Sequence, residues 1–128
     1  MPIVNNSDLE ILELPGLRHQ TIAGHRQGVE SMEVWLQTIA PGAGTPVHRH
    51  ACEEVVLILS GSGTCTVAGE TTAFGPNSTL ILKPDVVHQI VNTSDDDMRL
   101  VGILSMAPVR VKTAEGEPLP LPWEAPAK

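Results

Sequence analysis

The chain has 128 residues, enough for one domain with a hydrophobic core of its own. Its net charge is −7 and its 8 Lys and Arg residues form no cluster, which argues against nucleic-acid binding. No apolar run approaches the ~20 residues of a membrane span, and no basic segment followed by an apolar one opens the chain. We therefore expect a cytoplasmic protein without a signal peptide or a membrane partner.

The first part of the chain gives mixed signals. Leucine and isoleucine residues before Pro15-Gly16 suit either an edge strand or a short helical turn. His19 and His25 stand outside any spacing that is typical of metal ligands, and we expect both on the surface or in loops.

From residue 31 on, short apolar runs alternate with turn residues. Runs rich in Val, Ile, Leu and Thr predict strands over 32–39, 53–60, 64–67, 71–74, 80–82, 86–91, 98–106 and 109–111. Glycine, proline and asparagine separate these runs, and no stretch has the periodicity of a long helix. Eight to ten short strands of this kind predict an all-β protein built as a sandwich or barrel.

Two of these runs, 53–60 and 98–106, are apolar on both faces. Such strands are covered on both sides in a folded protein. Together they carry more apolar surface than one small barrel buries, so we expect a homodimer in which strands pack across the interface.

The chain changes character at Thr113. Three prolines alternate with two leucines over 118–122, and Trp123 follows. Because alternating prolines cannot continue a sheet, we expect one barrel domain with an N-terminal arm over 1–112 and a Pro-rich tail over 113–128. An exposed tryptophan beside two leucines would form an apolar patch. The tail is therefore either flexible or docked through Trp123, and the sequence leaves both open.

Two histidines and a carboxylate lie within seven residues of one another. Side chains two apart in an extended chain point to the same face, so one strand face can present His48, His50 and Glu54 together. Such a set lacks one ligand of a metal site. Arg49 and Glu53 would point the other way, and we expect a structural or interface role for Glu53.

His88 supplies the missing ligand. It lies in a strand-like run after a turn, and it adds a third imidazole to the set. Three neutral histidines and one carboxylate around a divalent cation leave a charge of about +1 and one or two open positions. In a low-dielectric barrel this charge favours an anionic ligand such as a small organic acid. The donor set alone suits Fe(II), Mn, Ni, Cu and Zn.

These residues resemble the two sequence motifs of the cupin family. The first motif is matched without exception by Gly42, His48, His50, Glu54 and Gly61. The second is matched by Pro84, His88 and Asn92. Asn77 and Asp85 stand where glycines are usual, and both residue types tolerate a positive φ. The resemblance implies a double-stranded β-helix, or jelly-roll barrel, that binds one divalent metal ion through His48, His50, Glu54 and His88.

A narrower resemblance covers about residues 20–112. The segment 33–55, together with 77–80 and 88–89, is similar to the core of the plant auxin-binding protein family. In that family the metal is zinc, and an aromatic acid coordinates it through its carboxylate. The resemblance implies a ligand pocket lined by Gln37, Thr45, Pro46, Val56, Val111 and Trp123.

The chain also departs from that family. Val56 stands at an aromatic position of the pocket, and the C-terminal tail is much shorter. The secretory signal, the retention signal of the endoplasmic reticulum and the terminal cysteines of the plant proteins are not found. The resemblance therefore extends to the fold and the metal site, not to auxin as the ligand.

Two functions are consistent with this site. One is a non-catalytic module that binds a small organic, carboxylate-bearing ligand at its metal ion. The alternative is a small metalloenzyme, such as a dioxygenase, isomerase or lyase, that uses the same four residues. The motifs contain no general acid or base beyond the metal ligands, so the sequence leaves open whether the protein is an enzyme.

Overall fold

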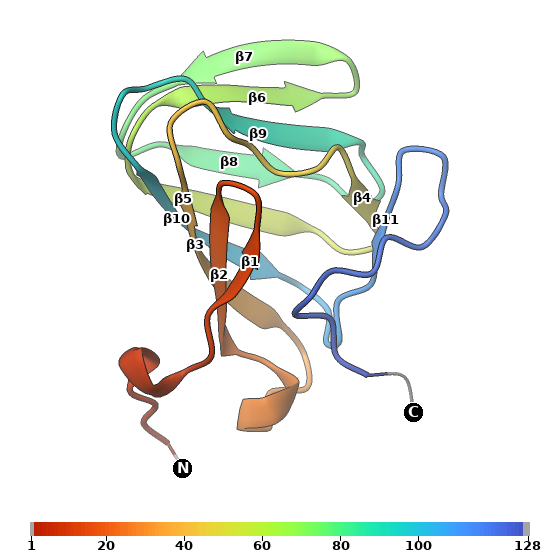
Figure 1. Cartoon of the computed structure of the whole chain (residues 1–128). Helices are drawn as coiled ribbons and strands as arrows, with labels where there is room; N and C mark the ends of the chain where they lie inside the picture. The colour runs from red at the N-terminus through yellow and green to blue at the C-terminus, as the bar shows by residue number, and fades with distance from the viewer. Residues whose placement is uncertain (1, 127–128) are drawn as a thin grey trace.

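The computed structural model describes residues 2–126, in which strands and turns predominate (Figure 1). Its two short 3-10 helices are η1 (Asn6–Asp8) and η2 (His25–Gln27). Its strands are β1 (Leu12–Leu14), β2 (Leu17–Ala23), β3 (Glu33–Ile39), β4 (Arg49–His50), β5 (Glu54–Ser60), β6 (Gly63–Val67), β7 (Glu70–Phe74), β8 (Thr79–Leu82), β9 (His88–Asn92), β10 (Met98–Leu104) and β11 (Val111–Lys112). The predicted all-β class is confirmed. Within residues 2–126 no helix is long and apolar enough to cross a membrane.

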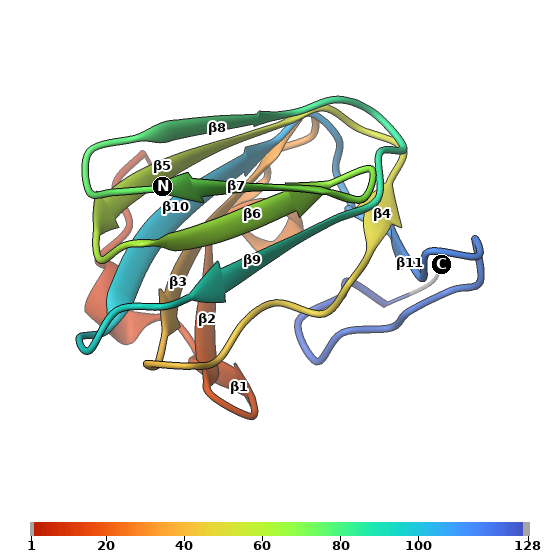
Figure 2. The ribbon, with the colours of Figure 1, turned by 90° about the horizontal axis from the view of Figure 1, so that it is seen from above.

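The strands form two layers that close into a barrel. One layer is the antiparallel sheet β1-β2-β3-β10-β5-β8, and the other contains β7-β6-β9. Single bridges join Gly44 to Val91 and His48 to His88, so the chain before β4 extends the second layer alongside β9. The short pair β4–β11 follows at one end of the barrel, as Figure 2 shows.

The core between the two layers is largely aliphatic. It is made of Leu17, Ile39, Val56, Ile58, Cys65, Leu82, Ile90, Met98 and Leu100. In β3 every second residue is buried, from Glu33 to Ile39, because successive side chains of a strand point to opposite faces. This alternation directs Gln37 and Trp35 into the same interior as the apolar residues.

The structure contains three details of the second cupin motif. Asn77 and Asp85 have φ values of 60° and 58°, the positive φ that both residue types tolerate. Asn92 is fully buried at the end of β9. Its amide donates to the carbonyls of Ile39 and Asp96 and accepts from the backbone of Ser94, which ties β3, β9 and the following turn together.

The expectation that His19 lies on the surface is wrong. Residues 17–23 form β2, which is paired on both sides by β1 and β3, and His19 is 1% exposed. Its Nδ1 accepts from Gln37 Nε2 at 3.0 Å, and its Nε2–H donates to Thr21 Oγ1 at 2.7 Å. Both ring nitrogens are therefore satisfied by neighbours in a neutral ring. His25 is exposed, as expected.

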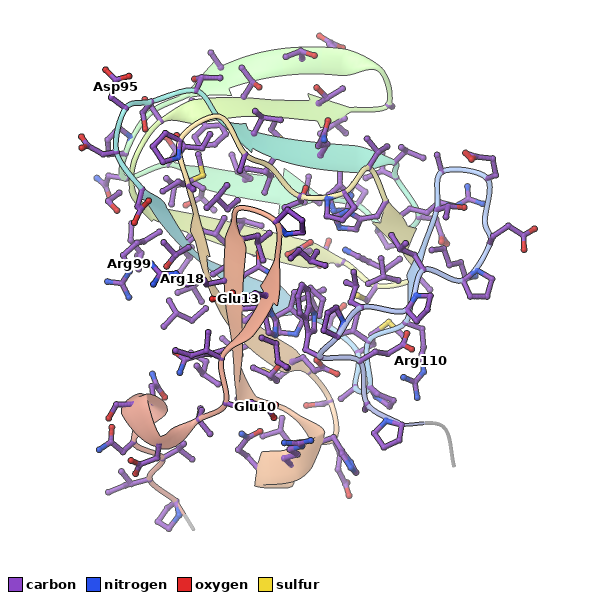
Figure 3. All side chains as sticks on the ribbon, viewed as in Figure 1. Glu10, Glu13, Arg18, Asp95, Arg99 and Arg110 are labelled. Carbon is purple, nitrogen blue, oxygen red and sulfur yellow. The ribbon has the colours of Figure 1, made fainter. Side chains whose placement is uncertain are left out.

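The tail is docked, which decides between the two alternatives for its described part, residues 113–126. Trp123 stacks on the His19 ring with centroids 3.8 Å apart, and its edge meets Trp35 at 5.8 Å. Arg110 donates to the carbonyl of Ala125 and pairs with Glu124 at 3.9 Å (Figure 3). Aromatic stacking and an ion pair thus fasten the tail over one end of the barrel.

The buried ring of His19 predicts a pH dependence of stability. Burial lowers the pKa of His19 from 6.5 to about 3, so below pH 6.5 the unfolded chain takes up a proton that the folded protein does not. Stability is therefore lost as the pH falls from 6.5 towards 3, by about 1.4 kcal/mol per pH unit for this group. Between pH 7 and pH 5 the free energy of unfolding should fall by about 2 kcal/mol more in the wild type than in His19→Gln. Urea denaturation at both pH values measures this difference.

His25→Gln is the matched control, because it makes the same replacement at an exposed histidine. Equal losses of stability in the wild type and in His19→Gln would show that His19 is not held neutral in the folded protein.

Candidate functional site

Three imidazoles and one carboxylate converge inside the barrel. His48 precedes β4, His50 ends it, and Glu54 and His88 begin β5 and β9. One donor atom from each residue lies within 4.8 Å of the others, and all four side chains are buried. The structure thus brings together the four residues that were predicted to form a metal site.

Backbone carbonyls orient all three imidazoles. Each Nδ1 lies in hydrogen-bond distance of a carbonyl two residues away: His48 to Pro46 O at 2.6 Å, His50 to Cys52 O at 3.0 Å and His88 to Val86 O at 2.9 Å. A carbonyl only accepts, so each Nδ1 carries a proton. The Nε2 atoms are left to face the centre, as in metal-binding histidines whose other nitrogen is fixed by a hydrogen bond.

Glu54 and His50 form a charged pair in the metal-free protein. Their side chains meet at 3.0 Å, between His50 Nε2 and Glu54 Oε1. Burial disfavours a charged ring, but hydrogen bonds to Cys52 and Glu54 outweigh it and raise the pKa of His50 to about 10. Burial likewise opposes the charge on Glu54, yet the hydrogen bond from His50 and the nearby His88 ring lower the pKa of Glu54 to about 2. A metal ion at this position would replace the shared proton.

The other two histidines leave ring nitrogens available to a cation. Burial, followed by repulsion from His88, lowers the pKa of His48 to about 4, so its Nε2 is a free lone pair at neutral pH. His88 Nε2 lies 3.5 Å from Glu54 Oε1, is buried, and makes no hydrogen bond. The buried His88 Nε2 without a hydrogen-bond partner lies beside the Glu54 carboxylate and the neutral His48 ring. Such a set of donors fits a divalent cation.

Gly102 makes room for the carboxylate. It lies on β10 directly beside β5, and a Cβ at this position would stand 2.8 Å from Glu54 Oε2. Any larger residue would therefore displace Glu54 or the strand. This glycine was missed by the sequence analysis, because a glycine within an apolar run carries no signal for a nearby carboxylate.

A small cavity adjoins the four residues. Its volume is about 30 Å³, and its wall includes His48, Glu54 and His88. Five of the six residues predicted to line a ligand pocket are part of this wall: Gln37, Thr45, Pro46, Val111 and Trp123. The sixth, Val56, is fully buried in the aliphatic core and does not line this cavity.

The polar wall of this cavity is rigid. Thr45 accepts from the backbone of Ile90 at 3.0 Å, and its carbonyl accepts from Gln89 at 2.9 Å. Gln37 is held by His19 on the opposite side, where its Nε2 donates to the ring. The apolar wall adds residues that sequence reasoning did not name: Leu17, Trp35, Ile90, Leu100 and Leu121. The alternation of β3 signals Trp35, whereas Leu121 belongs to the tail and depends on its docking.

Glu53 points away from the four residues. It is exposed on the outer side, and its carboxylate lies 3.8 Å from Lys83 Nζ. The alternation of side chains along β5 therefore separates Glu53 from Glu54, as expected from their positions in the sequence.

Comparison with known proteins agrees with this architecture. The model of the family "Auxin binding protein" matches residues 2–122. "Auxin-binding protein 1" of Arabidopsis thaliana is 42% identical over 125 residues, which cover 87% of this chain and 63% of the plant protein. The chain thus spans less than two thirds of that relative. "Gentisate 1,2 dioxygenase 1" of Aquipseudomonas alcaligenes is 37% identical over 89 residues, 69% of this chain and 24% of the dioxygenase.

Solved structures share the fold at low identity. A cupin of the RmlC-like type from Shewanella frigidimarina superposes with a TM-score of 0.73 at 19% identity, over 84% of this chain and 93% of the other. Oxalate decarboxylase of Bacillus subtilis gives a TM-score of 0.77 at 18% identity, over 84% of this chain and 30% of the other. The chain therefore has the predicted cupin fold and belongs to the auxin-binding protein family.

Proposed function

We propose that this protein binds one divalent metal ion through His48, His50, Glu54 and His88 and holds a small organic acid at that ion. The observation that carries this proposal is the set of three carbonyl-oriented imidazoles whose Nε2 atoms face one buried carboxylate. Bound there, the ion would supply a Lewis-acidic centre of net charge about +1 that favours an anionic ligand. The protein's own contribution is a shaped cavity whose polar wall is fixed by Thr45 and Gln37.

Two further features are proposed with this function. Zinc is the proposed ion, by family membership, since the donor set itself also suits Fe, Mn, Ni and Cu. A carboxylate is the proposed ligand group. One relative is named after gentisate, which is itself a carboxylate. We propose the barrel domain over 1–112 as the unit that binds both, with the described part of the tail, residues 113–126, as its cover.

A metalloenzyme is the second candidate function. The similarity to gentisate 1,2-dioxygenase, over 69% of this chain, favours a dioxygenase over the other reactions. Oxygen uptake by the Fe(II)-loaded protein with small and aromatic acids tests this candidate. Full zinc occupancy after purification without added metal, together with no oxygen uptake after Fe(II) loading, would exclude it.

Removal of one imidazole should abolish tight metal binding. Purified protein is stripped with a chelator, reloaded with zinc and measured by elemental analysis and calorimetry. The wild type should bind one ion per chain, and His48→Ala and His88→Ala should bind it at least ~100-fold more weakly, more than the loss of an outer hydrogen bond costs. His25→Ala is the control, since His25 is exposed and is not one of the four clustered residues. Equal affinity in His48→Ala would refute the proposed ligand set.

A carboxylate ligand should stabilise only the metal-loaded protein. Acetate at ten times its dissociation constant should add about 1.4 kcal/mol to the free energy of unfolding, which corresponds to a rise in melting temperature of roughly 4–6 °C. Acetamide has the same shape without the charge and should have no effect. Stabilisation that persists after chelation would place the acid elsewhere on the protein.

We also propose a homodimer that forms through the outer face of the large sheet, called here the outer face. Its centre is the apolar set Val34, Leu36, Val55, Leu57, Ile81, Val101 and Ile103. These residues are contiguous, because Val101 lies opposite both Leu36 and Leu57 in the strand register. Ile81 is exposed and the other six are half-buried, and a contiguous apolar set of this kind is typical of an interaction surface.

Charge at the two ends of the outer face favours a second copy of this chain as its partner. Arg18 and Arg99 flank Thr38 at one end, as Figure 3 shows for the two arginines. Glu53 lies at the opposite end, just before β5. A two-fold axis through the centre would set the arginine end of each copy over the Glu53 end of its partner.

Val101→Glu should therefore give a monomer. A charge at the centre of the outer face is costly to bury, whereas the barrel interior is untouched because Val101 points outward. Light scattering should report twice the chain mass for the wild type and the chain mass for this variant, with unchanged metal binding. Ala73→Glu, on exposed β7 of the other sheet, is the control and should remain a dimer. A monomeric wild type at micromolar concentration would contradict the proposal.

A further inference from the structure

Trp123 separates two cavities of unequal size. The cavity beside the four candidate metal ligands has a volume of about 30 Å³. A second cavity, of about 170 Å³, lies on the outer side. Among residues 2–126, Trp123 is the residue that the walls of both cavities share.

The two volumes admit different ligands. A cavity needs roughly 10–15 Å³ to hold one water molecule, so the inner one holds about two, which occupy about 60 Å³ of liquid. That space suits formate or acetate. An aromatic ring needs far more, since a cavity of roughly 150 Å³ is known to accommodate benzene. The outer cavity is of that size, but the Trp123 indole lies between it and the metal ligands.

Both ends of the chain build the outer cavity. Leu9 and Leu12 come from the N-terminal arm, Arg26 and Gln27 from the link between β2 and β3, and 122–126 from the tail. Its wall is mixed and includes aliphatic side chains such as Leu9 and Leu12 and charged ones such as Glu10 and Arg26. It would extend the inner cavity if the indole were absent.

Packing, without a hydrogen bond, holds the indole in place. One face of Trp123 stacks on His19 and its edge meets Trp35, while its Nε1 has no hydrogen-bond partner among the described residues. Arg110 holds the chain just beyond it, through Glu124 and Ala125. Replacing the indole therefore leaves no buried polar group without a hydrogen-bond partner. The tail also keeps its contacts with Arg110.

We propose that Trp123 sets the size of the ligand, so that the protein binds carboxylates of the formate and acetate class and excludes aromatic acids. This specificity rests on the proposed function, since it concerns the acid held at the metal ion. Trp123 is a specificity-determining residue: its ring occupies the space that an aromatic ligand would need. Removal of the ring joins the inner cavity to the outer one and admits such a ligand.

The test compares acetate with benzoate on the Co(II)-loaded protein. Titration calorimetry gives the affinity, and the visible absorption of Co(II) reports whether the acid reaches the ion. The wild type should bind acetate and bind benzoate at least ~10-fold more weakly. Trp123→Ala should bind benzoate at least ~10-fold more tightly than the wild type does, so that its preference for acetate over benzoate falls, and Trp123→Leu should lie between them.

Leu119→Ala is the matched control. Leu119 packs in the same tail but lines neither cavity, so its replacement should leave benzoate excluded. Circular dichroism and Co(II) stoichiometry verify that each variant is folded and loaded, and Trp123→Leu keeps an apolar side chain in case the alanine variant does not fold.

The outcomes separate the two proposals. Benzoate binding by the wild type as tight as that of acetate would overturn the role of Trp123. So would continued exclusion of benzoate by folded Trp123 variants that still bind acetate, and the proposed function would then stand. If neither acid binds to any Co(II)-loaded form, the proposed carboxylate function is wrong, and so is the proposed role of Trp123 in selecting ligands by size.

Discussion

Three backbone carbonyls govern the chemistry of this barrel, because each of them turns an imidazole towards one buried carboxylate. In every case the carbonyl belongs to a residue two positions from its histidine. The orientation of the donors is therefore a property of the backbone. Two of the histidines are also joined across the barrel wall, since His48 and His88 exchange backbone hydrogen bonds at 3.1 and 2.9 Å. Pairing of these two segments of the backbone therefore also brings two of the imidazoles together.

The carboxylate depends on a different constraint, the close packing of β5 against β10. Gly102 leaves the space that the Glu54 carboxylate occupies, and the charge of Glu54 is compensated by His50 in the absence of metal. A buried charge without such a partner would be strongly unfavourable. The same pair supplies a proton that a cation can displace, so metal binding and proton release are linked.

The sequence was sufficient for the four candidate ligands, because strand parity and motif spacing are local properties. The positive φ values at Asn77 and Asp85 were predictable for the same reason. β2 was not predictable, because its inward residues include His19 and Thr21, whose polarity masks the pattern of a buried strand. The side chain that satisfies the His19 ring, Gln37, comes from another strand, β3. Alternating prolines fit a free tail as well as a docked one, so only the stacking on His19 distinguishes them. Cavity volumes depend on the packing of many side chains and have no counterpart in local pattern.

The contact between Trp123 and His19 joins opposite ends of the chain. Contacts of high sequence separation form late, after the loop entropy of the intervening chain has been lost, so the barrel can close before the tail arrives. Such late, peripheral contacts are also the first to open in the native state, with a free energy below that of global unfolding. Exchange of the amide hydrogens in the tail should then be faster than in β5 and β10. The entrance to the metal ligands would open and close on its own timescale, while the barrel that holds them stays intact.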